Sequence, residues 1–226
     1  MKDLVAVVLA AGQGTRMYSG LPKVLHSVAG QPMIDHVLEA IEPLEPAKIF
    51  VVTGHMADMV KAHVGKRAIC VNQERRLGTA HAVRQVVPHI KDFRGNVLVM
   101  VGDPPLIRTE TLRELIKRRR AHQVAATVLT NVLDNPTGYG RIVRNRDGTV
   151  RKIVEEKDTN TYEEAIKEIN TGTYVFDCQK LIIALAKVGN KNAQKEYYLT
   201  DTVEILNRLG EEVEPVVGED PTETLG

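Results

Sequence analysis

A glycine-rich segment near the start of the chain has the residue types that hold a phosphate group. Residues 9–17 read LAAGQGTRM, and Lys23 follows a short distance later. Glycine lets the main chain approach a phosphate closely, and consecutive backbone N–H groups form a nest for its oxygens. Arg16 and Lys23 would add positive charge. The segment therefore predicts phosphate binding, although a glycine turn flanked by two solvated cations has the same pattern.

Two better-known phosphate motifs do not fit this spacing. The dinucleotide-binding pattern GxGxxG would need a third glycine at position 17, which is Met17. A Walker A loop would close with Gly-Lys followed by Ser or Thr, and residues 9–17 do not. Neither dinucleotide binding nor P-loop hydrolysis is favoured.

The elements around this segment predict an α/β fold. The first two thirds of the chain alternate β-rich runs with helical stretches, which is the pattern of a parallel sheet covered on both faces. The loop after the first strand then lies where open α/β sheets bind ligands. The predicted strands are residues 4–10, 48–53, 68–72 and 96–101, and the predicted helices are residues 32–41, 57–64, 79–87 and 109–120, the last with Thr109 as a cap.

From residue 124 onward the sequence is richer in strands and predicts a small added lobe. The turn at Asp147-Gly148 is typical of a β-hairpin. The predicted strands are residues 124–131, 141–144, 149–155 and 171–176, followed by helices at 178–187 and 199–209 and a polar tail at 219–226. We expect one domain over residues 1–226, with a first half of about 1–123 and a second half of about 124–226.

Composition and charge exclude several classes of protein. With 43% hydrophobic residues the 226-residue chain can bury a sizeable core, and its net charge of +1 argues against a protein that coats nucleic acid or a membrane. Cys70 and Cys178 are isolated, so we expect free thiols rather than a zinc site or a disulfide framework. The start does not read as a signal peptide, and the longest apolar runs fall short of the roughly 18 residues of a membrane span. The chain therefore reads as cytoplasmic.

Residues 9–17, with LPKVL at 21–25, resemble the signature of the sugar nucleotidyltransferase superfamily, in which this loop binds the nucleoside triphosphate. Taken together and in order, further segments resemble the uridylyltransferase domain of the bacterial bifunctional N-acetylglucosamine-1-phosphate uridylyltransferase/glucosamine-1-phosphate acetyltransferase family. These segments are LGTAHA at 77–82, GDPPL at 102–106, NPTGYGRI at 135–142, VEEKD at 154–158, EINTG at 168–172 and NAQKEYYLTD at 192–201.

The resemblance implies a Rossmann-like, doubly wound, mostly parallel sheet with a small strand-rich sugar-binding lobe. It also implies that UTP and N-acetylglucosamine 1-phosphate give UDP-N-acetylglucosamine, a precursor for peptidoglycan and lipopolysaccharide, and pyrophosphate. A sugar phosphate already offers an anionic oxygen, so this reaction needs positioning and charge neutralisation rather than a general base. Cations and a metal ligand are therefore the groups to look for.

The resemblance assigns roles to residues in both halves of the chain. Arg16 and Lys23 would neutralise phosphate charge, and Asp103 supplies a hard oxygen ligand suited to Mg²⁺. The nucleotide side comprises Leu9, Ala10, Ala11, Gly12, Gln73, Gly78 and Thr79. The sugar side comprises Gly102, Gly140, Glu155, Asn170, Tyr197 and Thr200. A cap or turn carboxylate before Pro104 is the alternative for Asp103. Without the resemblance, Glu155 would be a solvated strand charge, Gln73 a loop residue and Gly140 a turn. His81 is interpreted as a helix-packing histidine and is left out of the set.

Two departures from the family pattern and two rival functions qualify this interpretation. Val101 stands where relatives often carry Tyr or Ser. In the family a second metal-binding Asn follows soon after the segment aligned with residues 223–226, so we expect weak metal binding and reduced activity. The β-helix acetyltransferase domain, on which the family's trimers depend, comes later still, so we expect a monomer. The first rival is a different nucleotidyltransferase, because the same first loop serves dTTP–glucose, CTP–alditol and GTP–molybdopterin enzymes. The segments PTGYGRI and EINTG separate this chain from those enzymes. A non-catalytic nucleotide-sugar sensor is the alternative from another class, and Arg16, Lys23 and Asp103 argue against it.

Overall fold

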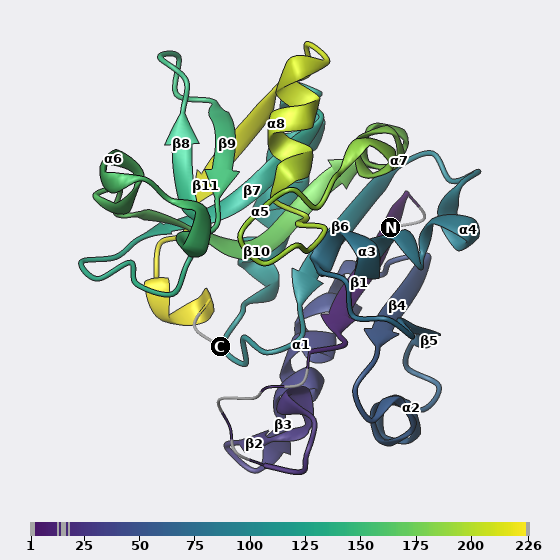
Figure 1. Ribbon diagram of the computed structural model, residues 1–226. Helices are drawn as coiled ribbons and strands as arrows, with labels where there is room; N and C mark the ends of the chain where they lie inside the picture. Colours follow the sequence, from purple (N-terminus) through teal and green to yellow (C-terminus); the bar gives the residue numbers. More distant parts are fainter. Residues whose placement is uncertain (1–2, 13, 15–16, 18, 225–226) are drawn as a thin grey trace.

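The computed structural model describes residues 3–12, 14, 17 and 19–224, and its centre is a mixed, mostly parallel β-sheet (Figure 1). The strand order is β11-β7-β10-β6-β1-β4-β5. These strands are β1 (Leu4–Ala10), β4 (Lys48–Thr53), β5 (Ile69–Asn72), β6 (Asn96–Val101), β7 (Ala126–Val132), β10 (Glu168–Asp177) and β11 (Val213–Val217). β1 pairs in parallel with both β4 and β6, which confirms the predicted parallel core.

The second half of the chain extends this same sheet. β10 runs antiparallel to β6 and β7, and β11 pairs in parallel with β7. A hairpin of β8 (Arg141–Arg144) and β9 (Val150–Val154) branches from β10 and rises with α8 (Asp201–Arg208) at the upper end of the view in Figure 1, away from β4 and β5. The strand-rich part of the chain is therefore continuous with the parallel strands, and a sheet edge shared by both halves is available for a site.

Helices cover both faces of the sheet, because side chains of successive strand residues point to opposite faces. In β1, Val5 and Val7 pack into one hydrophobic core, and Leu4, Ala6 and Val8 pack into the other. The first core is closed by α3 (Thr79–Arg84), α4 (Val87–Ile90), α7 (Cys178–Lys187) and α8; the second is closed by α1 (Met33–Ile41), α2 (Ala57–Val64) and α5 (Thr109–His122). Short elements complete the fold: β2 (Ser27–Val28), β3 (Gln31–Pro32), α6 (Thr161–Glu164) and the 3-10 turns η2 (Lys23–Leu25), η3 (Glu42–Leu44), η4 (Glu156–Asp158) and η5 (Pro221–Thr224).

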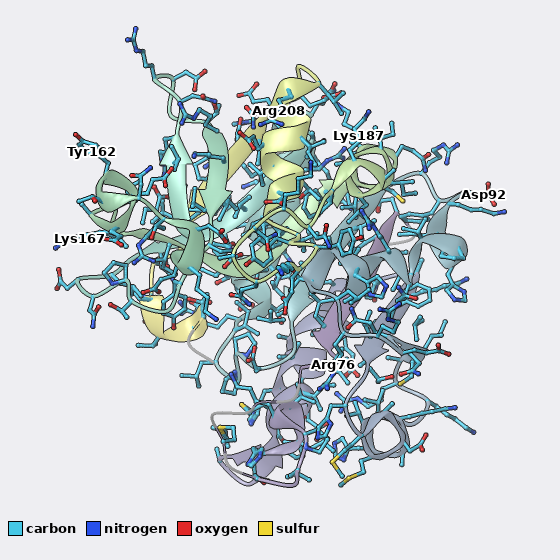
Figure 2. All side chains as sticks on the ribbon, viewed as in Figure 1. Arg76, Asp92, Tyr162, Lys167, Lys187 and Arg208 are labelled. Atoms are coloured by element: carbon cyan, nitrogen blue, oxygen red, sulfur yellow. The ribbon has the colours of Figure 1, made fainter. Side chains whose placement is uncertain are left out.

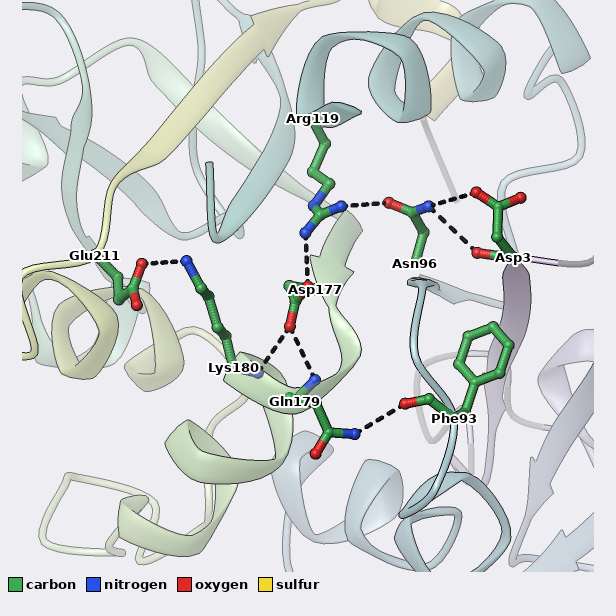
Figure 3. A network of polar contacts seen from close by, with 8 residues as sticks. All are labelled: Asp3, Phe93, Asn96, Arg119, Asp177, Gln179, Lys180 and Glu211. Atoms are coloured by element: carbon green, nitrogen blue, oxygen red, sulfur yellow. Dashed lines mark hydrogen bonds and ion pairs between the residues drawn. The ribbon is translucent and has the colours of Figure 1, made fainter. Parts of the chain in front are cut away.

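A polar network ties the strands together at the amino end of β6 (Figure 3). Asn96 donates to the backbone oxygen of Asp3 at 3.2 Å and accepts from Arg119 at 3.0 Å, and Arg119 also pairs with Asp177 at 2.8 Å. Asp177 then caps α7 by accepting from the backbone N–H groups of the first turn. β1, β6, β10, α5 and α7 are thus fixed at this end, and the carboxyl ends of β1 and β6 lie at the opposite edge.

Several sequence-based boundaries are wrong in detail. The helix predicted at 79–87 is two helices, because Pro88 lacks the backbone N–H that a continuous helix would need to bond to the Arg84 oxygen. The helix predicted at 199–209 begins at Asp201, and the helix predicted at 32–41 begins at Met33 after Pro32. The cap of α5 is Arg108 rather than Thr109, whose hydroxyl donates to the Ala40 oxygen at 2.8 Å instead.

The predicted polar tail is a docked segment through residue 224. Pro221–Thr224 forms a 3-10 turn, and Glu223 in it is only 4% exposed. The Glu223 carboxylate pairs with the Arg108 guanidinium and accepts from the Thr111 hydroxyl at 2.6 Å. A buried carboxylate is tolerated where a cation and a hydroxyl satisfy it, so this contact holds the end of the described chain against the start of α5.

The two cysteines are free, as predicted. Cys178 is buried at the start of α7, and Cys70 in β5 is partly buried. Burial raises the pKa of the Cys178 thiol to about 11, with the nearby Asp177 carboxylate contributing in the same direction. Cys178 therefore behaves as a core residue rather than as a nucleophile.

Candidate functional site

A cavity of about 490 Å³ opens at the carboxyl ends of β1 and β6, beside the loop that leads from β5 into α3. All seven residues predicted for the nucleotide side line it, together with Lys23 and Asp103. The lining is Leu9, Ala10, Ala11, Gly12, Gly14, Lys23, Val24, Gln73, Arg76, Gly78, Thr79, Ala82, Val101, Asp103 and Glu196. Arg16 lies outside the described residues, so its predicted role is neither supported nor opposed.

Lys23 and Asp103 form an ion pair at the wall of this cavity, with 2.6 Å between Nζ and Oδ2. Each side chain keeps about a fifth of its surface exposed, at 22% and 21%. Gly14 lies directly against Lys23: a Cβ at position 14 would lie 2.7 Å from the Lys23 Cβ, and its φ of +61° is left-handed. Gly14 therefore packs against the base of the Lys23 side chain, and Asp103 pairs with its ammonium group.

Gln73 is almost fully buried, at 3% exposure, in the same wall. Its amide nitrogen donates to the Gly78 oxygen at 3.1 Å and to the His81 Nδ1 at 2.9 Å. His81 is thus more than the helix-packing residue that the sequence indicated, because it contacts a residue that lines the cavity. Burial, followed by the charges of Arg84 and Arg75, lowers the pKa of His81 and favours the neutral ring.

The start of α3 joins the two halves of the chain. The Tyr197 N–H donates to the Leu77 oxygen at 2.8 Å, and the Ala80 N–H donates to the Tyr197 oxygen at 2.8 Å. The Thr79 hydroxyl accepts from the Leu199 N–H at 2.8 Å. The segment that contains residues 197–199 is therefore held onto the wall of the first cavity by its backbone.

A second cavity of about 210 Å³ adjoins the first, and Leu9, Thr79 and Val101 line both. Four of the six residues predicted for the sugar side line it: Gly140, Glu155, Asn170 and Thr200. The remaining lining residues are Gly138, Tyr139, Thr171, Gly172, Tyr174 and Leu199. Residues far apart in the sequence thus line two adjoining cavities at the sheet edge.

Two polar groups in the second cavity are oriented by buried neighbours. The Tyr174 hydroxyl donates to the Asn170 Oδ1 at 2.8 Å, and the Gly172 N–H donates to the same oxygen at 3.1 Å. The Asn170 amide nitrogen is thereby left as the group that can donate to a ligand. The Thr200 hydroxyl donates to the Glu155 Oε1 at 3.0 Å. Burial raises the pKa of Glu155, whereas the Thr200 hydrogen bond opposes that shift.

Comparison with known proteins identifies the family of the chain. The family model described as nucleotidyl transferase matches residues 5–220. The chain belongs to the nucleotidyl transferase family. Among curated proteins, this nucleotidyl transferase is similar to the bifunctional protein GlmU of Streptococcus suis (49% identity), of Brevibacillus brevis (52%) and of Geobacillus thermodenitrificans (51%). The matches cover 98–100% of this chain and 48–49% of those proteins, so it spans about half the length of the relatives it matches.

Two predicted sugar-side residues of this nucleotidyl transferase line neither cavity. Gly102 is packed between β1 and η2: a Cβ there would lie 3.1 Å from the Leu9 oxygen. Tyr197 contributes backbone hydrogen bonds, and the Arg84 guanidinium lies 4.7 Å over its ring. Both residues pack behind the cavity walls, so direct contact of Gly102 or Tyr197 with a sugar stays a prediction that the cavity lining does not support.

Sequence reasoning missed several residues that line the cavities. Arg76, labelled in Figure 2, comes from the loop between β5 and α3, and Glu196 comes from the segment before α8. Tyr174 reads as an ordinary core aromatic of a strand, and only its contact with Asn170 reveals a role. The sequence signal that could have indicated Arg76 is its position three residues after Gln73, within a recognised motif region.

The structure of this nucleotidyl transferase offers no helix, within the described residues, that is long and apolar enough to cross a membrane.

Asp201 gives this nucleotidyl transferase a pH-dependent stability that can be measured. Burial, then the charges of Glu155, Glu204 and Asp158, raises the pKa of Asp201 from 3.8 to about 6. Because the pKa of Asp201 is higher in the folded than in the unfolded chain, its contribution to folding stability is fully present below the unfolded pKa of 3.8. That contribution is lost as the pH rises through the folded pKa of about 6. We expect Asp201→Asn to be more stable than the parent at pH 7.5 by about 1 kcal/mol, after discounting for solvent screening, and nearly equal to it at pH 4. Urea unfolding at both pH values, with the exposed Asp92→Asn as control, measures the difference; an equal gain at both pH values would contradict the assignment.

Proposed function

We propose that this chain transfers the uridylyl group of UTP to N-acetylglucosamine 1-phosphate, giving UDP-N-acetylglucosamine and pyrophosphate. The observation that carries the proposal is the pair of adjoining cavities, with Lys23 and Asp103 in one and Glu155 and Asn170 in the other. The similarity to proteins named bifunctional protein GlmU, at 49–52% sequence identity over 98–100% of this chain, supports it. The product class is a precursor for peptidoglycan and lipopolysaccharide.

The proposed reaction is a single displacement at phosphorus. A phosphate oxygen of the sugar phosphate attacks the α-phosphorus of UTP, a new P–O bond forms, and the bond to the β-phosphate breaks so that pyrophosphate leaves with its electron pair. The attacking oxygen is already anionic, so no side chain has to remove a proton. The work of the protein is to align the two substrates and to neutralise charge.

On the nucleotide side, the triphosphate would lie on the backbone of the glycine loop, with Lys23 opposite the phosphates. Lys23 is well placed because Gly14 packs against its stem and Asp103 holds its ammonium group. Arg16 is proposed to add charge on the strength of the motif. Gln73, Gly78 and Thr79 line the same cavity and would hold the base and ribose.

On the sugar side, Asn170 and Glu155 offer complementary groups. Asn170 presents an amide N–H to the cavity because its oxygen is occupied by Tyr174 and Gly172. This donor suits the carbonyl of an acetamido group, whereas the Glu155 carboxylate suits a sugar hydroxyl. Thr200 orients Glu155, and Gly140 leaves room for the backbone to approach the sugar.

Mg²⁺ is proposed as the cofactor, with Asp103 as the protein ligand. Among the described residues no group of three His, Cys, Asp or Glu side chains could hold a metal ion. One carboxylate nevertheless fits Mg²⁺, which is commonly bound by one or two carboxylates together with substrate phosphates and water. Such an ion would neutralise phosphate charge, and Asp103 lies at the cavity wall where phosphates are proposed to lie.

Substrate choice tests the proposed function. Pyrophosphate release is measured with ATP, GTP, CTP and UTP, each combined with glucose 1-phosphate and with N-acetylglucosamine 1-phosphate, with and without Mg²⁺. We expect release with UTP and N-acetylglucosamine 1-phosphate to exceed that with every other pair by at least about tenfold, since each wrong group leaves buried polar atoms unpaired. Binding of UTP without pyrophosphate release from any pair would contradict the proposal and favour a sensor.

A further inference from the structure

The turn at residues 136–140 forms part of the wall of the second cavity. Gly138, Tyr139 and Gly140 line that cavity, and the Tyr139 N–H closes the turn by donating to the Pro136 oxygen at 3.2 Å. Gly138 has a φ of +92°, and no atom of the described residues lies within 4 Å of the position that a Cβ would take there. The tip of the turn is therefore free of packing on that side, and hydrogen bonds have to hold it in place.

Two charged side chains hold the tip of this turn. Glu156, in η4, accepts a hydrogen bond from the Gly138 N–H with Oε2. Arg141, the first residue of β8, donates from Nη1 to the Tyr139 oxygen. The Glu156 Oε2 also lies 3.8 Å from the Arg141 Nη1. Among the described residues, these are the hydrogen bonds that join Gly138 and Tyr139 to groups outside the turn.

Stability alone does not explain why Arg141 is buried. Its side chain is 3% exposed, and taking a guanidinium out of water is costly unless the charge is closely paired. The 3.8 Å ion pair with Glu156 is long, and the Glu156 side chain keeps 35% of its surface exposed. The close contact of Arg141 is instead with the carbonyl of Tyr139, which belongs to the cavity wall. This placement indicates that Arg141 orients the wall.

We propose that Arg141 and Glu156 are positioning residues for the sugar phosphate, because together they fix the backbone of the turn that lines its cavity. A trans peptide directs its C=O and N–H groups to opposite sides, and the described chain has no cis peptide bond. With the Tyr139 oxygen turned toward Arg141, the Gly140 N–H points away from Arg141. Neither charged residue lines the first or the second cavity, so the effect passes through the backbone. The identity of the ligand rests on the proposed function.

Loss of either side chain is expected to weaken binding of the sugar phosphate. In Arg141→Met the Tyr139 carbonyl loses its donor. In Glu156→Ala the Gly138 N–H loses its acceptor. The turn then samples several orientations, and we expect the KM for N-acetylglucosamine 1-phosphate to rise at least about tenfold in each variant, with kcat and the KM for UTP changing less than about twofold. Because both side chains act on one turn, the double variant should be no worse than the poorer single variant.

Arg144→Met is the matched control. Arg144 lies at the other end of β8 and makes a closer ion pair, 2.7 Å from Glu168 of β10, and neither residue lines the two cavities. If the ion pairs of this hairpin contribute only to stability, Arg141→Met and Arg144→Met will both unfold more easily, and the KM for the sugar phosphate will change in neither. Arg141→Lys keeps a donor and a charge and should recover part of the lost affinity.

Two measurements that need no turnover separate this proposal from the proposed function. Calorimetry gives the affinity of the parent and of each variant for N-acetylglucosamine 1-phosphate. Amide hydrogen exchange follows the Gly138 N–H, which should exchange at least about tenfold faster in Glu156→Ala than in the parent. A parent chain that binds the sugar phosphate but releases no pyrophosphate would contradict the proposed function and leave the role of Arg141 and Glu156 to the affinities.

The partly exposed Glu156 makes Glu156→Ala the deciding variant if Arg141→Met does not fold. A weaker affinity for the sugar phosphate together with faster exchange of Gly138 supports the proposal. Equal affinity in the parent and in folded Glu156→Ala, or equal exchange of the Gly138 N–H, would overturn it. A parent chain that does not bind the sugar phosphate would overturn both this proposal and the proposed function.

Discussion

Replacing Asp103 by Asn is expected to lower turnover by about 100-fold to 1,000-fold while the fold stays intact. Asn has nearly the same shape but cannot carry the negative charge that a metal ion and the Lys23 ammonium group require. The side chain lies at the wall of the cavity with a fifth of its surface exposed, so little packing is lost. Steady-state kinetics at saturating substrates, with thermal unfolding as a check on the fold, measures the effect.

Asp134→Asn is the matched control for this substitution. Asp134 is a fully exposed carboxylate that pairs with Lys167 at 3.0 Å on the surface, and it lines neither cavity. We expect its turnover to equal that of the parent, because exposed ion pairs contribute little. An Asp103→Asn variant that retains more than about a third of parental turnover would show that this carboxylate does not hold an essential ion.

Replacing Gly78 by Ala is expected to destabilise the protein by about 3 kcal/mol or more and to remove activity with it. Gly78 has a φ of +109°, and a Cβ there would lie 2.5 Å from the Tyr197 oxygen and 2.7 Å from the Tyr197 nitrogen. Both neighbours are backbone atoms that cannot rotate aside. The hydrogen bonds that hold Tyr197 to Leu77 and Ala80 would therefore have to lengthen, and the wall between the halves would move.

Gly30→Ala separates backbone strain from this steric clash. Gly30 has a φ of +91°, but nothing lies within 4 Å of the position of its Cβ. It follows Ala29, which already adopts a positive φ in the turn between β2 and β3. We expect Gly30→Ala to cost only about 1–2 kcal/mol and to keep its activity. Urea unfolding measures the loss of stability in both variants. Equal losses would mean that backbone strain, rather than the clash with Tyr197, explains the effect of Gly78→Ala.

Sequence patterns predict the central strands well because these strands are buried on both faces. Residues 4–10 and 96–101 are continuous Val- and Leu-rich runs, and both strands have the predicted bounds. β11 was missed because its sequence, VEPVV, contains Pro215, which argues against a strand inside a sheet. β11 is the edge strand of the sheet, where proline is tolerated.

The site was predictable where it follows local motifs and unpredictable where it depends on tertiary contacts. Residues 9–12, Gln73, Gly78 and Asp103, to which the family resemblance assigns nucleotide and metal binding, line one cavity, and their binding roles stay predictions. The Tyr174 hydroxyl donates to Asn170, and the β10–β7 pairing is irregular between these two residues, which no local pattern reveals. Likewise, the contact of the buried Glu223 carboxylate with the half-exposed Arg108 joins residues that are 115 positions apart.

Tracing the α-phosphate of UTP tests the central claim most directly. The chain is incubated with Mg²⁺, N-acetylglucosamine 1-phosphate and UTP that carries a radioactive α-phosphate, and the products are separated by chromatography. Because the proposed displacement occurs at the α-phosphorus, the label should appear in UDP-N-acetylglucosamine, with unlabelled pyrophosphate released in equal amount. Label that remains in UTP, or that is released as UMP or UDP without a sugar attached, would contradict the proposal that the adjoining cavities bring the two substrates together for uridylyl transfer.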